Sequence, residues 1–197
     1  MSKALNNMSI ILASASPRRR ELLEMLGVKD MKIIPAKGEE HVPAGASPAE
    51  SVIAISGGKA REVSEQCAPG DVIIAADTVV CLDGEILGKP HDTEDAKNML
   101  RRLSGREHEV YTGVTVVKDG LVFQDAECTK VRFRALSPYE IDAYVATGEP
   151  MDKAGAYGAQ GIASLFVEGI TGDFFNVMGL PLCRLGRMLN NVGVNLL

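Results

Sequence analysis

Short apolar runs rich in β-branched residues predict the strands of a β-sheet. We expect strands over residues 10–12, 31–35, 71–82, 86–87, 108–118, 121–133 and 165–170. The run VIIAADTVV within 71–82 is apolar except at Asp77 and Thr78, which is typical of a central strand covered on both faces. Asp-Gly pairs at 83–84 and 119–120 predict tight turns, so the strands beside each pair should form hairpins.

Amphipathic segments between these runs predict the helices. They cover residues 17–26, 48–67, 93–103 and 138–147, and a last helix follows Pro181. Three helices begin with Ser-Pro, and the serine can cap the first free backbone N–H groups. Ser47 and Ser137 are each followed three residues later by glutamate, which predicts a capping box. The pair Gly57-Gly58 predicts a break or a weak point in the second helix.

The order of strands and helices indicates an α/β fold with a mixed sheet. The chain has 197 residues, 46% of them hydrophobic, which is enough to bury one sizeable core. We therefore expect one domain over residues 1–197, built as two lobes that share one sheet.

Three consecutive arginines lie where a helix normally prefers acidic residues. Arg18, Arg19 and Arg20 fall in the first turn after Ser16-Pro17, where the helix dipole is already positive. For a single arginine, a solvated helix start is the simpler interpretation. For the whole strand, turn and helix start, we favour a phosphate site, since free N–H groups and guanidinium groups together bind phosphate oxygens.

The rest of the composition favours a small anionic ligand. The net charge of -5 argues against non-specific binding to nucleic acid or a membrane surface. The four cysteines are widely spaced, so we expect reduced and mostly buried thiols. The first seven residues are polar and the apolar run after them is short, which predicts no signal peptide, no membrane span and a cytoplasmic location.

Asp77 is the most conspicuous candidate for chemistry. A carboxylate at the end of an apolar strand is costly to bury unless it is paired, bound to metal or catalytic. An aspartate satisfied by nearby backbone N–H groups is an equally good interpretation of the residue by itself. Lys89, between Gly88 and Pro90, and Lys59 are further candidates, although each alone reads as a surface lysine. Glu39 and Glu40 form an acidic pair that can hold a divalent ion.

The glycine-rich stretch 155–161 is a candidate ligand loop. Its glycines permit close approach of the backbone, Tyr157 offers a stacking face, and Gln160 offers an amide that can read the edge of a base. A purely structural glycine turn competes with this interpretation. The sequence has neither a phosphate-binding G-x-x-x-x-G-K-[ST] motif nor G-x-G-x-x-G, and its histidines match no catalytic or metal-binding spacing.

Taken in order, these motifs make the chain resemble the Maf family of nucleotide pyrophosphatases along nearly its whole length. The motifs that carry the resemblance are Ser14-Ala15-Ser16-Pro17-Arg18-Arg19, Lys59-Ala60, Ala76-Asp77-Thr78-Val79, Gly88-Lys89-Pro90, Leu103-Ser104-Gly105, Asp152-Lys153-Ala154-Gly155-Ala156-Tyr157-Gly158-Ala159-Gln160-Gly161 and Asn176-Val177-Met178-Gly179-Leu180-Pro181.

The resemblance implies an α/β fold like that of inosine triphosphate pyrophosphatases, with an elongated mixed sheet and two lobes flanking a central cleft. It implies hydrolysis of a nucleoside triphosphate to the monophosphate and pyrophosphate with a divalent cation, Mg²⁺ or Mn²⁺, and a homodimer. The proton acceptor of the family falls on Asp77, which is also a candidate metal ligand with Glu40. The substrate-binding positions fall on Ser14, Arg18, Arg19, Lys59, Thr78, Lys89 and Gln160.

The form Ala-Gly-Ala-Tyr-Gly of the late motif resembles the branch that acts on dTTP and UTP. Ala159 departs from that branch, which usually has an isoleucine-like residue there. Two alternatives stay open: a pyrophosphatase for 7-methyl-GTP, and a nucleotide-binding regulator of septum formation or cell division with little turnover. Binding of structured RNA is disfavoured by the acidic total and by the lack of interleaved aromatic residues.

Overall fold

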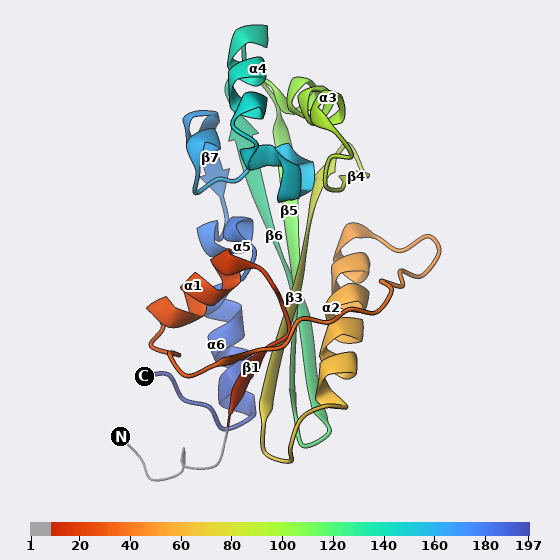
Figure 1. Ribbon diagram of the computed structural model, residues 1–197, viewed down its shortest axis with the longest axis vertical. Helices are drawn as coiled ribbons and strands as arrows, with labels where there is room; N and C mark the ends of the chain where they lie inside the picture. The colour runs from red at the N-terminus through yellow and green to blue at the C-terminus, as the bar shows by residue number, and fades with distance from the viewer. Residues whose placement is uncertain (1–8) are drawn as a thin grey trace. The chain divides into compact units, whose positions relative to one another are not determined.

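The computed structural model describes residues 9–197 (Figure 1). The strands are β1 (Ile10–Leu12), β2 (Lys32–Ile33), β3 (Val72–Leu82), β4 (Glu85–Leu87), β5 (Glu107–Lys118), β6 (Leu121–Phe133) and β7 (Val167–Thr171). The α-helices are α1 (Pro17–Met25), α2 (Pro48–Ser64), α3 (Thr93–Leu103), α4 (Pro138–Ala146), α5 (Phe174–Met178) and α6 (Leu182–Asn191). Short 3₁₀ helices are η2 (Glu149–Asp152), η3 (Ala154–Ala156) and η4 (Ile162–Leu165). The first seven residues, on which the expectation of no signal peptide rests, lie outside the described part.

Within this described range the strands form a seven-stranded mixed sheet in the order β2-β1-β3-β5-β6-β7, with β4 beside β3. β1 runs parallel to β2 and β3, whereas β4 runs antiparallel to β3 and β7 antiparallel to β6. Asp83 and Asp119, each followed by glycine, have positive φ values as such turns require. All seven expected strands are confirmed, and so are both hairpins.

The chain divides into two compact units that share the long strands. Unit 1 comprises Met1–Asp77, Thr112–Glu127 and Gly179–Leu197, and unit 2 comprises Thr78–Tyr111 and Cys128–Met178. The boundaries fall inside β3, β5 and β6, so each of these strands supplies residues to both units. Each unit is described separately below.

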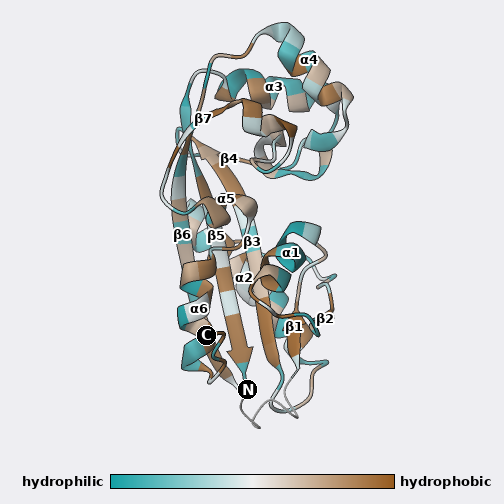
Figure 2. Ribbon diagram, turned by 90° about the vertical axis from the view of Figure 1, so that its left-hand side faces the viewer, coloured by the Kyte–Doolittle hydropathy of each residue, from teal (hydrophilic) through white to brown (hydrophobic). Residues whose placement is uncertain are grey.

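Unit 1 has an aliphatic core between its part of the sheet and α2. The buried residues of this cluster are Ile11, Ala13, Ala60, Val63, Ile73, Ala75 and Val117. In Figure 2, β1 is hydrophobic throughout, as a strand paired on both sides and covered by helices should be. Helix α2 comes very close to β5, because a Cβ atom at Gly113 would lie 2.3 Å from the carbonyl oxygen of Val52. Only glycine fits there, and this contact sets the distance of α2 from the sheet.

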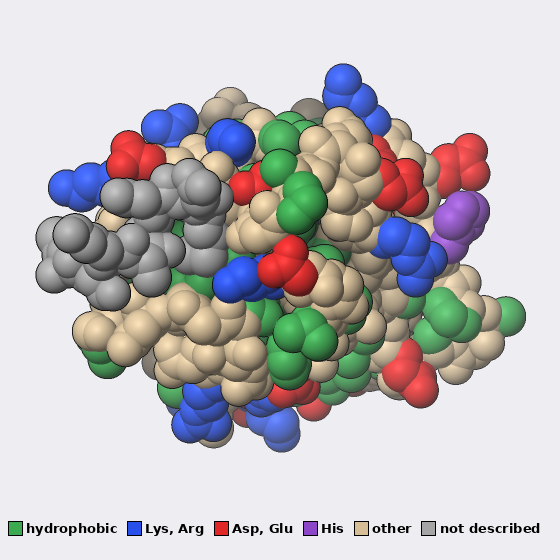
Figure 3. Space-filling view, turned by 90° about the horizontal axis from the view of Figure 1, so that it is seen from below, with side chains coloured by type: hydrophobic (Ala, Val, Ile, Leu, Met, Phe, Trp, Pro, Cys, Tyr) green, Lys and Arg blue, Asp and Glu red, His purple; other side chains and the backbone are tan. Residues whose placement is uncertain are grey.

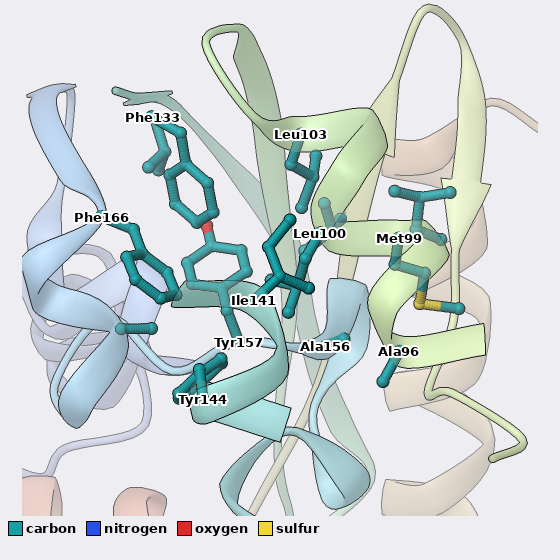
Figure 4. Close-up of a cluster of buried hydrophobic side chains, with 14 of the residues drawn as sticks. Ala96, Met99, Leu100, Leu103, Phe133, Ile141, Tyr144, Ala156, Tyr157 and Phe166 are labelled. Atoms are coloured by element: carbon teal, nitrogen blue, oxygen red, sulfur yellow. The ribbon is translucent and has the colours of Figure 1, made fainter. Parts of the chain in front are cut away.

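Unit 2 has an aromatic core (Figure 4). The rings of Phe133 and Tyr157 meet edge to face at 4.8 Å, and Phe166 packs edge to face against Tyr144 at 5.1 Å. His108 is also buried here, with its Nε2 atom 2.7 Å from the hydroxyl of Tyr157. Helices α3 and α4 supply aliphatic side chains to the same cluster.

The structure corrects several details of the sequence-based expectations. Helix α2 is continuous through Gly57-Gly58, since its glycines lie mid-helix and the surrounding turns stay helical. Ser16 makes no side-chain capping bond, whereas Ser47 and Ser137 form the predicted capping boxes. The four cysteines, all among the described residues, form no disulfide, and they are not mostly buried: Cys81 is buried, Cys67 is half-buried, and Cys128 and Cys183 are exposed.

Among the described residues, no helix has both the length and the apolar character needed to cross a bilayer. The face of the molecule drawn in Figure 3 carries Lys and Arg side chains interspersed with Asp and Glu side chains. That face is therefore of mixed charge.

Candidate active site

Two carboxylates of unit 1 meet at one lysine. The ammonium nitrogen of Lys59 lies 2.7 Å from Asp77 Oδ1 and 2.7 Å from Glu40 Oε1. The side chains of Lys59 and Asp77 are only 20% and 14% exposed, whereas that of Glu40 is 53% exposed. The cluster thus joins α2, β3 and the loop before α2, and it is open to solvent on the side of Glu40.

The neighbours of Asp77 follow from the local sequence. Asp77 is the last residue of β3 in unit 1, and the apolar residues 72–76 before it are buried. The strand continues to Leu82, so the expectation that Asp77 ends the strand is wrong. Its carboxylate accepts a charge-assisted hydrogen bond from the ammonium of Lys59.

Arg19 is tied in place by two hydrogen bonds. Its Nε donates to the carbonyl oxygen of Gly179 at 2.8 Å, and its Nη1 donates to Ser14 Oγ at 3.0 Å. Ser14 Oγ also accepts from the backbone N–H of Ser16 at 3.2 Å, which shapes the turn between β1 and α1. The first arginine-rich helix turn is therefore held against both the preceding strand and the segment that leads into α6.

The electrostatic surroundings of Arg19 place it in the same cluster. Burial lowers the pKa of its guanidinium, the charge of Asp77 opposes this shift, and Arg18 and Glu40 act with smaller opposite effects. Arginine stays charged at neutral pH in any case. Arg19 and Lys59 thus bring positive charge to the same two carboxylates, and Arg18 adds a further positive charge near Arg19.

The N-terminus of α1 differs from those of α2, α3 and α4. Those three have a side-chain cap and an acidic residue in the first turn, whereas α1 has neither. The positive end of the α1 dipole therefore has no acidic side chain of its own first turn beside it, which suits the binding of an anion. Arg20, by contrast, is exposed and pairs with Glu24 one turn later, so it belongs to the helix surface.

The other predicted site residues lie in unit 2. Thr78 is half-buried at the start of the β3 segment of that unit, and Lys89 is exposed. Lys89 borders a surface pocket of about 460 Å³ between β4 and α3, which is also lined by His91, Asp95 and Arg102. The cluster of Asp77 does not line this pocket.

Gln160 is exposed on the loop between η3 and η4. Tyr157, on the same loop, is buried and bonded to His108, so the expectation that it offers a stacking face is wrong. The loop glycines do allow close approach, but of protein groups: a Cβ atom at Gly155 would lie 2.8 Å from a methyl of Val80. Sequence reasoning also missed the roles of Gly179 and Glu149. The carbonyl oxygen of Gly179 accepts a hydrogen bond from Arg19, and the carboxylate of Glu149 accepts one from the backbone of this loop.

The residues present fit a divalent cation together with phosphate. Asp77 and Glu40 both contact the ammonium of Lys59, so two carboxylates converge on one cationic group. Among the residues that the structure describes, no group of three or more His, Cys, Asp or Glu side chains could hold a metal alone. A pair of carboxylates suits Mg²⁺ or Mn²⁺, whose other ligands are water and substrate phosphate oxygens.

Comparison with known proteins identifies the family of the chain. The family model described as Maf-like protein matches residues 9–192. The chain belongs to the Maf family. A dTTP/UTP pyrophosphatase of Clostridium botulinum (strain Okra / Type B1) is 47% identical over 193 residues, covering 95% of this chain and 99% of that protein. A dTTP/UTP pyrophosphatase of Symbiobacterium thermophilum is 50% identical over 184 residues, covering 93% of this chain and 94% of that protein.

A solved structure supports the fold of this Maf-family chain. The structure of a HAM1 protein from Coxiella burnetii aligns with a TM-score of 0.53 and 18% sequence identity, covering 93% of this chain and 99% of that chain. The expected α/β fold class with a mixed sheet is confirmed. The central cleft implied by the resemblance stays a prediction.

Proposed function

We propose that the chain is a nucleoside triphosphate pyrophosphatase that hydrolyses dTTP and UTP to the monophosphate and pyrophosphate. The observation that carries the proposal is the cluster of Arg18, Arg19, Lys59, Glu40 and Asp77 in unit 1. The family membership and the names of relatives at 47% and 50% identity support the same reaction and substrates.

Phosphate binding falls to the start of α1. The helix dipole and the guanidinium groups of Arg18 and Arg19 supply positive charge and hydrogen-bond donors, and Ser14 orients Arg19. Such preorganised donors stabilise the charge that develops on phosphate oxygens in the transition state. Lys89 adds a further cation in the proposed mechanism, and Gln160 and Thr78 read the pyrimidine edge.

Asp77 has the role of proton acceptor. Water attacks the α-phosphorus, Asp77 accepts its proton, and the bond to the bridging oxygen of the leaving pyrophosphate breaks. The hydrogen bond from Lys59 holds the Asp77 carboxylate in place before the attack. Glu40 and Asp77 would hold the divalent cation, which neutralises phosphate oxygens when it is bound.

Pyrophosphate release from a nucleotide panel tests the proposal. The panel comprises dTTP, UTP, CTP, GTP, 7-methyl-GTP and modified uridine triphosphates, each with Mg²⁺, Mn²⁺ or EDTA. We expect metal-dependent turnover of dTTP and UTP above the other nucleotides, and the Asp77→Asn protein serves as the inactive control. Turnover of 7-methyl-GTP alone would support the proposed hydrolysis to monophosphate and pyrophosphate but would reject dTTP and UTP as the substrates. Nucleotide binding by calorimetry with no release would favour the regulator of cell division instead.

A homodimer and a cytoplasmic location belong to the same proposal. Light scattering of the purified chain checks the first, and cell fractionation checks the second. A monomer at working concentration would reject the dimer without affecting the proposed reaction.

A further inference from the structure

One carboxylate of unit 2 holds both ends of the loop that carries Gln160. Glu149 Oε2 accepts a hydrogen bond from the backbone N–H of Ile162 at 3.1 Å, and its Oε1 accepts one from the hydroxyl of Tyr144 at 3.0 Å. The backbone N–H of Gly158 in turn donates to the Tyr144 hydroxyl. Glu149 is therefore connected to one end of the loop directly and to the other end through Tyr144.

The loop also packs directly on this carboxylate. A Cβ atom at Gly161 would lie 2.2 Å from Glu149 Oε1, so no larger residue fits while Glu149 keeps its place. Gly158 is similarly close to the side chain of Lys153, where a Cβ atom would lie 2.8 Å from Cε. The ammonium of Lys153 donates to the carbonyl oxygen of Glu149 at 2.6 Å. The loop thus rests on side chains that are themselves connected.

Glu149 and Tyr144 are well placed for this task. Tyr144 is 2% exposed in the aromatic core, and burial followed by the hydrogen bond to Glu149 raises the pKa of its hydroxyl, which therefore stays a donor. Glu149 follows α4, where its backbone N–H donates to Thr147 Oγ1 at 3.1 Å. The carboxylate is anchored to rigid elements, whereas Gln160 beside it is exposed.

We propose that Glu149 is a positioning residue for substrate selectivity, which acts by fixing the loop that presents the Gln160 amide to the pyrimidine edge. This inference rests on the proposed function, because it requires Gln160 to contact the base. A planar amide distinguishes uracil from cytosine only if its donor and its acceptor are held in orientation, since the two bases present opposite groups at that edge. A loop released from Glu149 would let the amide rotate.

Steady-state kinetics with UTP and CTP test the inference. We expect Glu149→Ala to raise KM for UTP about tenfold, the loss of roughly one charge-assisted hydrogen bond, while kcat changes less than about twofold. KM for CTP should stay the same. Glu149→Gln keeps one acceptor oxygen and should restore most of the selectivity. Glu168→Ala, which removes an exposed carboxylate of the same unit paired with Arg132, is the matched control and should leave both KM values unchanged.

A double variant separates positioning from a general structural role. If Glu149 acts through Gln160, Glu149→Ala should add no further loss to Gln160→Ala. An equal effect in both backgrounds, or an equal loss with UTP and CTP, would overturn the inference. Where Glu149→Ala lowers the melting temperature too far to be assayed, Tyr144→Phe removes only the hydroxyl and should raise KM for UTP by about threefold. If Tyr144→Phe leaves the ratio of the KM values for UTP and CTP unchanged, the inference is also overturned.

The wild-type protein distinguishes this inference from the proposed function. No pyrophosphate release from UTP, or equal efficiency with UTP and CTP, would reject the proposed substrates themselves. Selective turnover by the wild type together with undiminished selectivity in Glu149→Ala would reject the positioning role alone.

Discussion

The two units differ in the charge and the burial of their polar groups. Unit 1 gathers charged side chains at Lys59, Asp77 and Glu40, partly open to solvent, above an aliphatic core. Unit 2 buries neutral polar groups, with His108 and the Tyr157 hydroxyl hydrogen-bonded inside an aromatic cluster. Charged groups retain affinity for an anion only where water or ligand can reach them, whereas a buried neutral network stabilises the core that contains it.

This comparison shows that a polar residue in a largely buried strand can serve either a ligand site or the core. Asp77 lies in β3 and His108 lies in β5, and most residues of both strands are buried. One meets a cation and the other meets a hydroxyl and aromatic edges. Changes to the charged cluster of unit 1 should therefore alter turnover more than stability, and changes to the buried polar groups of unit 2 should do the reverse.

Replacement of Asp77 should give the largest effect. Asp77→Asn removes the proton acceptor and a carboxylate of the cation pair, so turnover of UTP should fall by about a thousandfold. The side chain keeps its size and Lys59 keeps Glu40 as a partner, so the melting temperature should change little. Pyrophosphate release and thermal unfolding of the same preparation measure both. Turnover near that of the wild type would remove Asp77 from the mechanism.

The buried histidine should make unit 2 sensitive to acid. Burial lowers the pKa of His108 from 6.5 to about 4 in the folded protein. As the pH falls below 6.5, the ordinary pKa of histidine, His108 takes up a proton in the unfolded chain but not yet in the folded protein. The contribution of neutral His108 to the free energy of unfolding is therefore fully present above pH 6.5 and is lost as the pH falls towards about 4. The loss should reach about 3 kcal/mol.

Urea unfolding across this range checks the acid effect. His108→Gln cannot titrate, so its stability should fall by about 3 kcal/mol less than that of the wild type between neutral pH and the folded pKa. The two proteins should differ little in KM near neutral pH. Parallel pH profiles of the two unfolding free energies would contradict the buried neutral histidine.

Within unit 1, neighbouring arginines should differ sharply. Arg19→Lys loses the fork that donates to both Ser14 and Gly179, so kcat/KM should fall about tenfold. Arg20→Lys is the matched control, because Arg20 is exposed and pairs with Glu24 of its own helix. Equal losses in both variants would indicate a general effect of basic charge instead of an oriented guanidinium.

The smallest expected effect is on the free energy of unfolding, in a comparison of two helices that begin with Ser-Pro. Ser137→Ala removes a capping box at α4 in unit 2 and should cost about 1 kcal/mol of unfolding free energy. Ser16→Ala at α1 in unit 1 removes no capping bond and should cost nearly nothing. Urea titrations of both variants give the values. Similar costs would show that Ser16 caps α1 after all.

Much of this could be predicted from local patterns. Strand runs, Asp-Gly turns and the Ser-x-x-Glu boxes depend on neighbouring residues, and the structure confirms them. Local patterns could not predict that α2 continues through Gly57-Gly58, because tertiary packing outweighs the weak helix propensity of glycine. The burial of Tyr157 depends on His108, which lies far away in the sequence.

The candidate site shows the same division. The arginine-rich helix start, Asp77 and Glu40 stand out by residue type and position. That Lys59 would meet both carboxylates, and that Glu149 would hold the loop of Gln160, could not be deduced from spacing, because the partners come from separate elements.

The sequence by itself determined the elements, the family and the residues capable of binding phosphate, because these depend on composition, periodicity and short motifs. Only the tertiary structure decided which polar groups are paired, which serines cap a helix and which aromatic residue is buried. Those outcomes depend on side chains that approach from distant parts of the chain, and local residue patterns carry no information about such partners.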